Sequence, residues 1–265
     1  MIRVWLAGAG VLGPGLPDSA AARDILLGVV PYADAPDPEP VPALLPANER
    51  RRASGPARWA LTVGSEALAR SGLAPQDVAV VFTSCGGDGV ITDQICRALA
   101  AQPPEMSPTR FHNSVHNAPA GYWSIFARSR APSTTLCGYD ASFAAGLLEA
   151  AAQAAVERRP VLLVAYDLKS PEPLHGLWPV PRPFAAALVL TPDPAGSEKV
   201  RLGIEIADGN VSPVSPAWPD ALPGELAANP AAQALVLLAA VAKKTGARAG
   251  LQYLRNSHVA VEIDP

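Results

Sequence analysis

The sequence predicts a layered α/β fold, in which strands and helices alternate along the chain. Short continuous apolar runs such as Val78–Thr83 and Val161–Ala165 are typical of strands that are covered on both faces. Between such runs lie longer segments with helical apolar spacing, and one of them, Ala141–Glu157, is apolar over most of its circumference. This alternation favours a sheet with helices packed against it.

The first expected elements are a strand, Ile2–Leu6, and a tight glycine-rich turn after it. The proline-rich stretch Val30–Pro46 cannot hold a long helix, because proline lacks an amide donor and restricts the residue before it. We interpret it as an ordered surface loop or a partner-binding strap. A helix should follow over Glu49–Ser71, with a basic start at Arg50–Arg52, and Gly72 should end it.

The rest of the body continues the alternation. The further elements expected are the strand Val78–Thr83, the helices Ile91–Leu99 and Ala118–Arg128, the strand Ser133–Cys137, the helix Ala141–Glu157, and the strands Val161–Ala165, Phe184–Leu190 and Val200–Ile206. The last two strands are expected to be neighbours in the sheet, because consecutive strands often pair. This division gives a body over residues 1–205 and a C-terminal extension over residues 206–265 that packs on the same core.

The extension begins near a proline-rich segment, Ser212–Pro223, and offers one helix, Ala231–Lys244, and one strand within Leu251–Ile263. The helix Ala141–Glu157 needs a cover, because a helix that is apolar almost all round is buried on several sides. Its polar or small positions form one narrow stripe: Ser142, Gly146, Glu149, Gln153 and Glu157. We expect the tail helix to pack against it.

Composition and charge exclude several classes of function. With 265 residues, of which 49% are hydrophobic and 17% charged, the chain can bury a large core. A net charge of −3 gives no electrostatic footprint for nucleic acid, and no apolar stretch reaches the roughly 18 residues that span a bilayer. The three cysteines are scattered and no signal peptide is recognisable, so we expect a soluble cytoplasmic protein without membrane association.

Two motifs point to ligands but have simpler explanations. Gly8, Gly10 and Gly13 satisfy G-x-G-x-x-G after a strand, as in a dinucleotide site, yet Pro14 stands where the phosphate-binding helix should run. We favour a tight turn there and expect no cofactor.

His112 and His116 have the i, i+4 spacing of metal ligands on a helix. The residues before and between them favour a loop, and no Cys, Asp or Glu lies close enough in sequence to complete a set of ligands. We therefore expect no metal.

Residues 107–150 read SPTRFHNSVHNAPAGYWSIFARSRAPSTTLCGYDASFAAGLLEA. This segment resembles the N-terminal half of the β-ketoacyl synthases, in which a helix and a strand lead to the nucleophilic cysteine. The residues that fall on the family pattern without a gap are Asn117, Ala120, Gly121, Ile125, Pro132 and Ser142. The resemblance extends over roughly residues 1–205 and implies a thiolase-like half-fold with a mixed sheet, completed by a short helix-strand tail.

The sequence departs from this family at the residues that carry its chemistry. Ungapped alignment places Asp140 at the position of the nucleophilic cysteine, and Cys137 stands three residues earlier. An aspartate there is a good N-cap but a poor acyl acceptor, whereas a cysteine at a helix start is activated by the helix dipole. The family's two catalytic histidines, in H-G-T-G-T and G-F-G-G-H motifs, are also absent from these 265 residues.

We therefore predict a subunit that is not an enzyme on its own. It is similar to the chain-length-factor subunits of aryl polyene biosynthesis, which implies pairing with a full-length, active β-ketoacyl synthase and indirect contact with an acyl carrier protein. An acyltransferase or thioesterase that acts through Cys137 or Asp140 is the alternative.

In the family, the segments matching Arg110–Ile125 and Ser133–Tyr139 face the partner, so this resemblance also suggests which residues would line its acyl tunnel or interface. The candidates are Phe111, His112, His116, Asn117, Tyr122, Trp123, Phe126, Cys137, Tyr139, Asp140 and Phe143. Ordinary core packing is the competing interpretation for each bulky member of this set.

Overall fold

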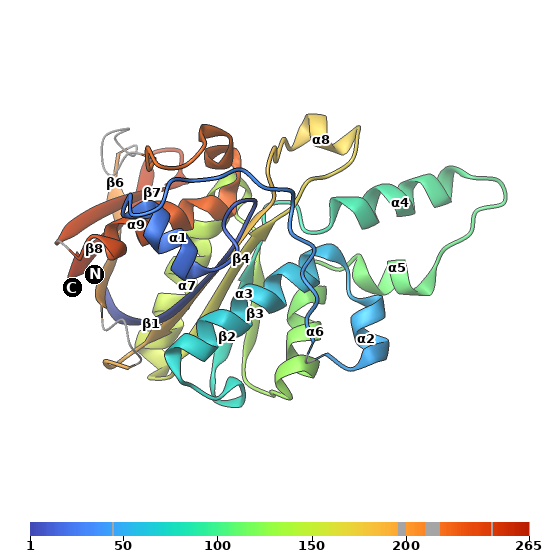
Figure 1. The fold of residues 1–265 in the computed structure, drawn as a ribbon. Coiled ribbons are helices and arrows are strands. Elements are labelled where there is room, and N and C mark those ends of the chain that lie inside the picture. Colours follow the sequence, from blue (N-terminus) through green and yellow to red (C-terminus); the bar gives the residue numbers. More distant parts are fainter. Residues whose placement is uncertain (44, 196–199, 210–217, 245, 265) are drawn as a thin grey trace.

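The computed structural model describes residues 1–43, 45–195, 200–209, 218–244 and 246–264. Within them, one mixed sheet of eight strands forms the centre of the molecule, with helices on both faces (Figure 1). The predicted layered α/β class with a mixed sheet is confirmed.

The strands, in chain order, are β1 (Ile2–Leu12), β2 (Ala79–Thr83), β3 (Ser133–Leu136), β4 (Val161–Asp167), β5 (Phe184–Thr191), β6 (Val200–Asp208), β7 (Ala247–Leu254) and β8 (Ser257–Asp264). Their order across the sheet is β3-β2-β4-β5-β1-β6-β8-β7. Strand β2 pairs in parallel with β3 and β4, and the other pairs are antiparallel. The short strand β3 therefore lies at one edge.

The α-helices are α1 (Ser19–Leu26), α2 (Ala47–Arg52), α3 (Gly55–Ser71), α4 (Gly89–Ala100), α5 (Pro108–Asn113), α6 (Ala118–Ala127), α7 (Ser142–Glu157), α8 (Leu174–Leu177) and α9 (Gln233–Ala242). The 3-10 turns are η1 (Pro75–Asp77), η2 (Tyr139–Ala141), η3 (Gly224–Ala228) and η4 (Pro230–Ala232). Helices α3 and α6 cover one face of the sheet, and α1, α7 and α9 cover the other.

Strand residues alternate between two apolar cores, as a period of two requires. In β4, Val161 and Leu163 enter the core shared with α7, while Leu162 and Val164 enter the core shared with α3. Every residue of β4 is buried, which explains why the strand reads as a continuous apolar run.

The expected tight turn after the first strand is present at Gly13–Leu16, but Gly8 and Gly10 are not part of it. Strand β1 continues to Leu12, so Gly8 and Gly10 lie inside it, and helix α3 packs directly on them. A Cβ at Gly10 would lie 2.1 Å from the carbonyl oxygen of Val63, and one at Gly8 would lie 2.3 Å from that of Ala67. These glycines permit close helix–strand packing, and the dinucleotide interpretation of the motif has no structural basis.

The helix expected over Glu49–Ser71 is in fact two helices. The first ends at Arg52, Ala53 is extended, and α3 begins with Pro56 in its first turn. A proline inside a continuous helix would clash with the carbonyl group four residues earlier, so the chain breaks there. Gly72 ends α3 in the left-handed conformation, as predicted.

Helix α7 lies between the sheet and the C-terminal tail. It contacts strands β1, β2, β4 and β5 on one side and β7, η4 and α9 on the other. Phe143, Leu147 and Ala151 of α7 share one core with Leu235 and Leu238 of α9. The predicted cover by the tail helix is confirmed, and turn η4 and strand β7 add to it.

Two predictions about strand order and the tail are wrong. Strands β5 and β6 are not neighbours, because β1 lies between them. The tail holds a hairpin, β7 and β8, where one strand was expected, and β8 pairs with β6. The boundary predicted at residue 205 falls inside β6, and half of the segment Ser212–Pro223 lies outside the described residues. None of the described helices is long and apolar enough to cross a membrane.

Candidate functional site

The position predicted for a nucleophile lies between β3 and α7. After β3, the chain passes through Cys137 and Gly138 into the 3-10 turn η2, in which Tyr139 has a left-handed φ of 55°. The hydroxyl of Ser142 accepts a hydrogen bond from the Gly138 amide (3.1 Å) and donates one to the Tyr139 carbonyl (2.6 Å). This local network fixes the entry to α7.

Asp140 is exposed in this turn, and the prediction that it is the N-cap of the helix is wrong. Turn η2 shifts the helix start past Asp140, so the N-cap residue of α7 is Ala141. The alanine side chain cannot accept a hydrogen bond from the first turn of the helix. The Asp140 carbonyl oxygen accepts a hydrogen bond from Nε2 of Gln233 in the tail (2.9 Å). The tail therefore holds the turn from outside, while the carboxylate stays open to solvent.

A pocket of about 340 Å³ opens beside Asp140. It lies where the carboxyl ends of β2 and β3 lead into loops, which is the usual ligand site of a sheet with parallel strands. Its lining residues come from both of these loops, from the loop before β5 and from the tail: Cys85, Tyr139, Asp140, Trp178, Pro179, Val180, Ala227, Ala228, Pro230, Gln233 and Gln252. No histidine is among them in the described part of the chain.

Neither nearby thiol has the surroundings of an activated nucleophile. Cys137 is exposed just after β3, and its Sγ donates to the carbonyl oxygen of Cys85 (3.2 Å). Cys85 is half-buried, and burial, together with the charge of Asp167, raises the pKa of its thiol. A raised pKa keeps sulfur in its weakly nucleophilic protonated form at neutral pH.

A buried carboxyl group at the end of β4 was not predicted from the sequence. Asp167 is 2% exposed, and its Oδ1 accepts hydrogen bonds from the Ser84 hydroxyl and the Cys85 amide, both at 2.8 Å. Burial raises the pKa of Asp167 to about 6, although these hydrogen bonds oppose the shift. The sequence did contain a signal for this group, because an acidic residue directly after a strand-like apolar run is expected at the carboxyl edge of the sheet, where ligands bind.

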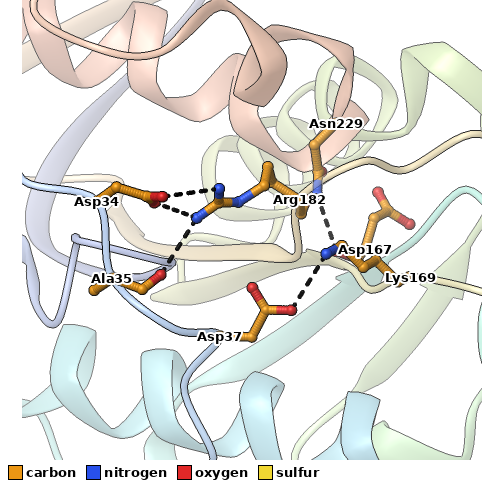
Figure 2. A network of polar contacts seen from close by, with 7 residues as sticks. All are labelled: Asp34, Ala35, Asp37, Asp167, Lys169, Arg182 and Asn229. Atoms are coloured by element: carbon orange, nitrogen blue, oxygen red, sulfur yellow. Dashed lines mark hydrogen bonds and ion pairs between the residues drawn. The ribbon is translucent and has the colours of Figure 1, made fainter.

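The proline-rich stretch Val30–Pro46 is an exposed strap, with no helix or strand among its described residues. Figure 2 shows how it is fastened: Asp34 pairs with Arg182, and Asp37 pairs with Lys169 (3.5 Å). The hydrogen bond from Arg182 lowers the pKa of Asp34.

From the tail, a buried side chain holds the same loop that the strap contacts. The side chain of Asn229, which is fully buried, donates to the carbonyl oxygens of Asp167 and Arg182, both at 2.9 Å (Figure 2). The loop between β4 and β5, which leads to Trp178 and Val180 in the pocket wall, is thus held from both sides.

The structure separates the predicted lining residues into buried and exposed groups. Tyr122, Trp123 and Phe143 are at most 2% exposed, and Trp123 packs against Gly64, Phe82 and Phe126. These three side chains belong to the cores of this chain. Phe126 is half-buried beside them.

The other members of the set face outward. Phe111 is 65% and Tyr139 53% exposed, and Asn117 is exposed as well. His112, which lies on α5 and not in a loop, stacks edge-on against Tyr122, and Nε2 of His116 lies 3.3 Å from the carbonyl oxygen of Ser84. Among the described residues, no cluster of three His, Cys, Asp or Glu side chains could hold a metal ion.

The edge of the sheet at β3 is open. A shallow hollow of about 540 Å³ lies between β3 and α6, lined by His116, Asn117, Ala120, Gly121, Ser124, Ser133 and Thr135. Figure 1 shows α4 and α5 extending from this side of the body as an arm. Helix α4 buries none of its residues, and apolar side chains on or near the arm remain exposed, among them Val90, Leu99, Phe111 and Val115.

Comparisons with known proteins agree with the fold. Residues 30–245 match the family model described as Beta-ketoacyl synthase, N-terminal domain. A solved structure of the ketosynthase ApeO in complex with its chain length factor ApeC from Xenorhabdus doucetiae aligns at 25% identity with a TM-score of 0.72, over 100% of each chain. No match was found among curated protein sequences.

Two further solved structures share the fold. The ishigamide ketosynthase/chain length factor aligns at 13% identity with a TM-score of 0.75, over 99% of each chain. AntDE:AntF, a type II polyketide synthase acyl-carrier protein in complex with its ketosynthase, aligns at 14% identity with a TM-score of 0.74, also over 99% of each chain. The predicted thiolase-like ketosynthase fold is therefore confirmed.

Proposed function

This chain belongs to the β-ketoacyl synthase family, and from that premise we propose that it is a non-catalytic, chain-length-factor-like subunit. It would pair with an active β-ketoacyl synthase and shape that enzyme's acyl tunnel in aryl polyene or related polyketide or fatty acid biosynthesis. The observation that carries the proposal is the carboxylate of Asp140 in the turn that leads into α7, where the family pattern has its nucleophilic cysteine. A carboxylate cannot form the thioester that condensation requires.

The surroundings of Asp140 support the absence of condensation chemistry. The thiol nearest in sequence, Cys137, follows β3 directly and does not lie at the helix start. The neighbouring thiol of Cys85 has a raised pKa. No histidine lines the described pocket, so an oxyanion formed there would have no imidazole donor.

The β3 side of the molecule supports partner binding. An edge strand presents unpaired backbone amides and carbonyls, which proteins normally cover or pair. The outer face of α6 beside it is small and polar, and Gly121 has open space around it. A second subunit that approaches this edge could extend the sheet across the interface.

The exposed aromatic residues give a steric mechanism for length control. Phe111 on the arm and Tyr139 in turn η2 are available to a partner's tunnel without disturbing the cores of this chain. A growing acyl chain would extend until its end meets such a side chain, after which further extension requires overlap. Acyl carrier protein would reach this subunit only indirectly, and we place the complex in the cytoplasm.

Co-expression with a full-length synthase tests the pairing. We expect a stable 1:1 complex by size-exclusion chromatography with light scattering. Gly121→Arg should abolish it, because the added side chain projects from the open face without an internal clash. Gly224→Arg, at a tail glycine with equally open surroundings, is the matched control and should leave the complex intact.

Two outcomes would overturn the proposal. One is a folded Gly121→Arg variant that binds the synthase as the wild type does. The other is an acyl adduct on the purified chain, detected by intact mass after incubation with an acyl-carrier thioester, because such an adduct would favour the acyltransferase or thioesterase alternative.

A further inference from the structure

A second pocket shares no lining residue with the pocket beside Asp140 and plays no part in the proposed function. It is formed where α1 and the last turn of α9 meet β1, and its volume is about 120 Å³. Its floor is apolar, and the residues that form it are Leu6, Ala9, Ala22, Leu26, Leu238 and Val241. The last turns of α1 and α9 thus leave a small apolar surface open to solvent.

The floor is less completely covered than the rest of the core. Leu26, Leu238 and Val241 are 7–8% exposed, whereas Leu235 and Leu237, on the same helix α9, are fully buried. Because exposed apolar surface is unfavourable in water, a ligand with an apolar end would gain free energy by covering it.

The mouth of the pocket carries excess positive charge. Arg23, Arg70 and Lys244 line it, against the single carboxylate of Asp24. Arg70 is already paired with Glu66 (3.2 Å), and Glu66 also accepts hydrogen bonds from the Ser19 amide and hydroxyl. Within the described residues, no ion pair engages Arg23 or Lys244.

We propose that this pocket binds a short-chain carboxylate, with the apolar chain against the floor and the carboxylate near Arg23 and Lys244. A cavity of about 150 Å³ accommodates benzene, so a volume of about 120 Å³ suits an apolar chain of roughly four to six carbons. Ligand pockets are typically lined by apolar side chains with a few polar or charged groups that fix the orientation of the ligand, and this pocket has that composition. The affinity of so small a ligand should be modest, with a Kd on the order of 1 mM.

Methyl-resolved NMR of the full chain, alone or in its complex, tests the site with hexanoate as the probe. We expect saturable shifts of the Leu26, Leu238 and Val241 methyl groups. Hexylamine, which has the same chain and the opposite charge, should bind at least tenfold more weakly.

Charge-reversal variants localise the head group. Arg23→Glu should weaken hexanoate binding at least tenfold, and Lys244→Glu should weaken it in the same direction. Arg255→Glu, at an exposed arginine in the β7–β8 turn, is the matched control and should bind as the wild type does.

A blocking variant tests the floor independently of charge. Ala20 is an exposed lining residue, so Ala20→Trp can obstruct the pocket without removing buried atoms, and it should abolish the shifts. The proposal fails if hexanoate gives no saturable shifts, if hexylamine binds equally well, or if a folded Arg23→Glu protein retains wild-type affinity. None of these results bears on pairing with a synthase.

Discussion

Trp123 and Phe111 are both aromatic members of the predicted tunnel set, yet the structure gives them opposite surroundings. Trp123 is 1% exposed and packs against Phe82 and Gly64, whereas Phe111 is 65% exposed. Removing a buried aromatic side chain leaves a cavity and costs about 3–5 kcal/mol. Trp123→Ala should lower the free energy of unfolding by about that amount, while Phe111→Ala should change it by less than about 0.5 kcal/mol.

Urea denaturation of the purified chain, followed by circular dichroism, measures the two free energies. Val156→Ala, at a position that is 82% exposed on α7, controls for a surface truncation. In the complex with a synthase, Phe111→Ala should lengthen the products, as measured by mass spectrometry. Trp123→Ala should lower the yield of complex, and the complex that forms should make products of unchanged length. Wild-type stability for Trp123→Ala, or longer products from it at a normal yield of complex, would refute the assignment of Trp123 to the core.

Three further predictions concern packing, ionisation and chemistry. Gly10→Ala should lower the free energy of unfolding by about 1–3 kcal/mol, because its Cβ would lie 2.1 Å from the Val63 carbonyl oxygen. Gly121→Ala is the control, since a Cβ there meets nothing within 4 Å. Equal thermal midpoints for the two variants would contradict the prediction. Because burial raises the pKa of Asp167 to about 6, the folded state favours its protonated form, so the free energy of unfolding should fall by up to about 3 kcal/mol as the pH rises from about 4 to 6. Asp167→Asn should remove that slope in urea titrations, and a slope that persists must arise from another group. Asp140→Cys should yield no condensation product by mass spectrometry, since no histidine lines the described pocket; a product would show that the thiol alone suffices.

Local patterns predicted the element types of the body well, because the central strands β2, β4 and β5 are buried along their whole length and therefore read as continuous apolar runs. Contacts distant in sequence were not predictable in the same way. The motif containing Gly8 and Gly10 reads like a phosphate-binding turn, and only the position of Val63 on α3 shows that these glycines make room for a helix. The placement of β1 between β5 and β6 likewise depends on strand pairing across the chain, which hydrophobic periodicity does not encode.

The candidate site divides in the same manner. Asp140 could be located from the sequence, because it stands on an ungapped motif next to a helix start. The tie from Gln233 to the Asp140 carbonyl, and the burial of Asp167 by Asn229 and Ser84, join segments far apart in the chain. Which aromatic residues can contact a partner depends on their exposure in the fold. The sequence motif that contains them does not reveal that exposure.

The arm formed by α4 and α5 ties the fold most directly to a partner. Helix α4 is 12 residues long and buries none of them, although the Asp88 carboxylate caps its start by accepting a hydrogen bond from the Ile91 amide (2.9 Å). Isolated helices shorter than about 12–15 residues are marginal in water, so a cap alone should leave α4 frayed. Covering Val90 and Leu99 by a second subunit would supply the missing apolar burial. Hydrogen exchange at the α4 amides should therefore slow on complex formation, relative to those of α7, which is already buried in the chain; unchanged exchange in α4 would mean that the arm takes no part in the interface.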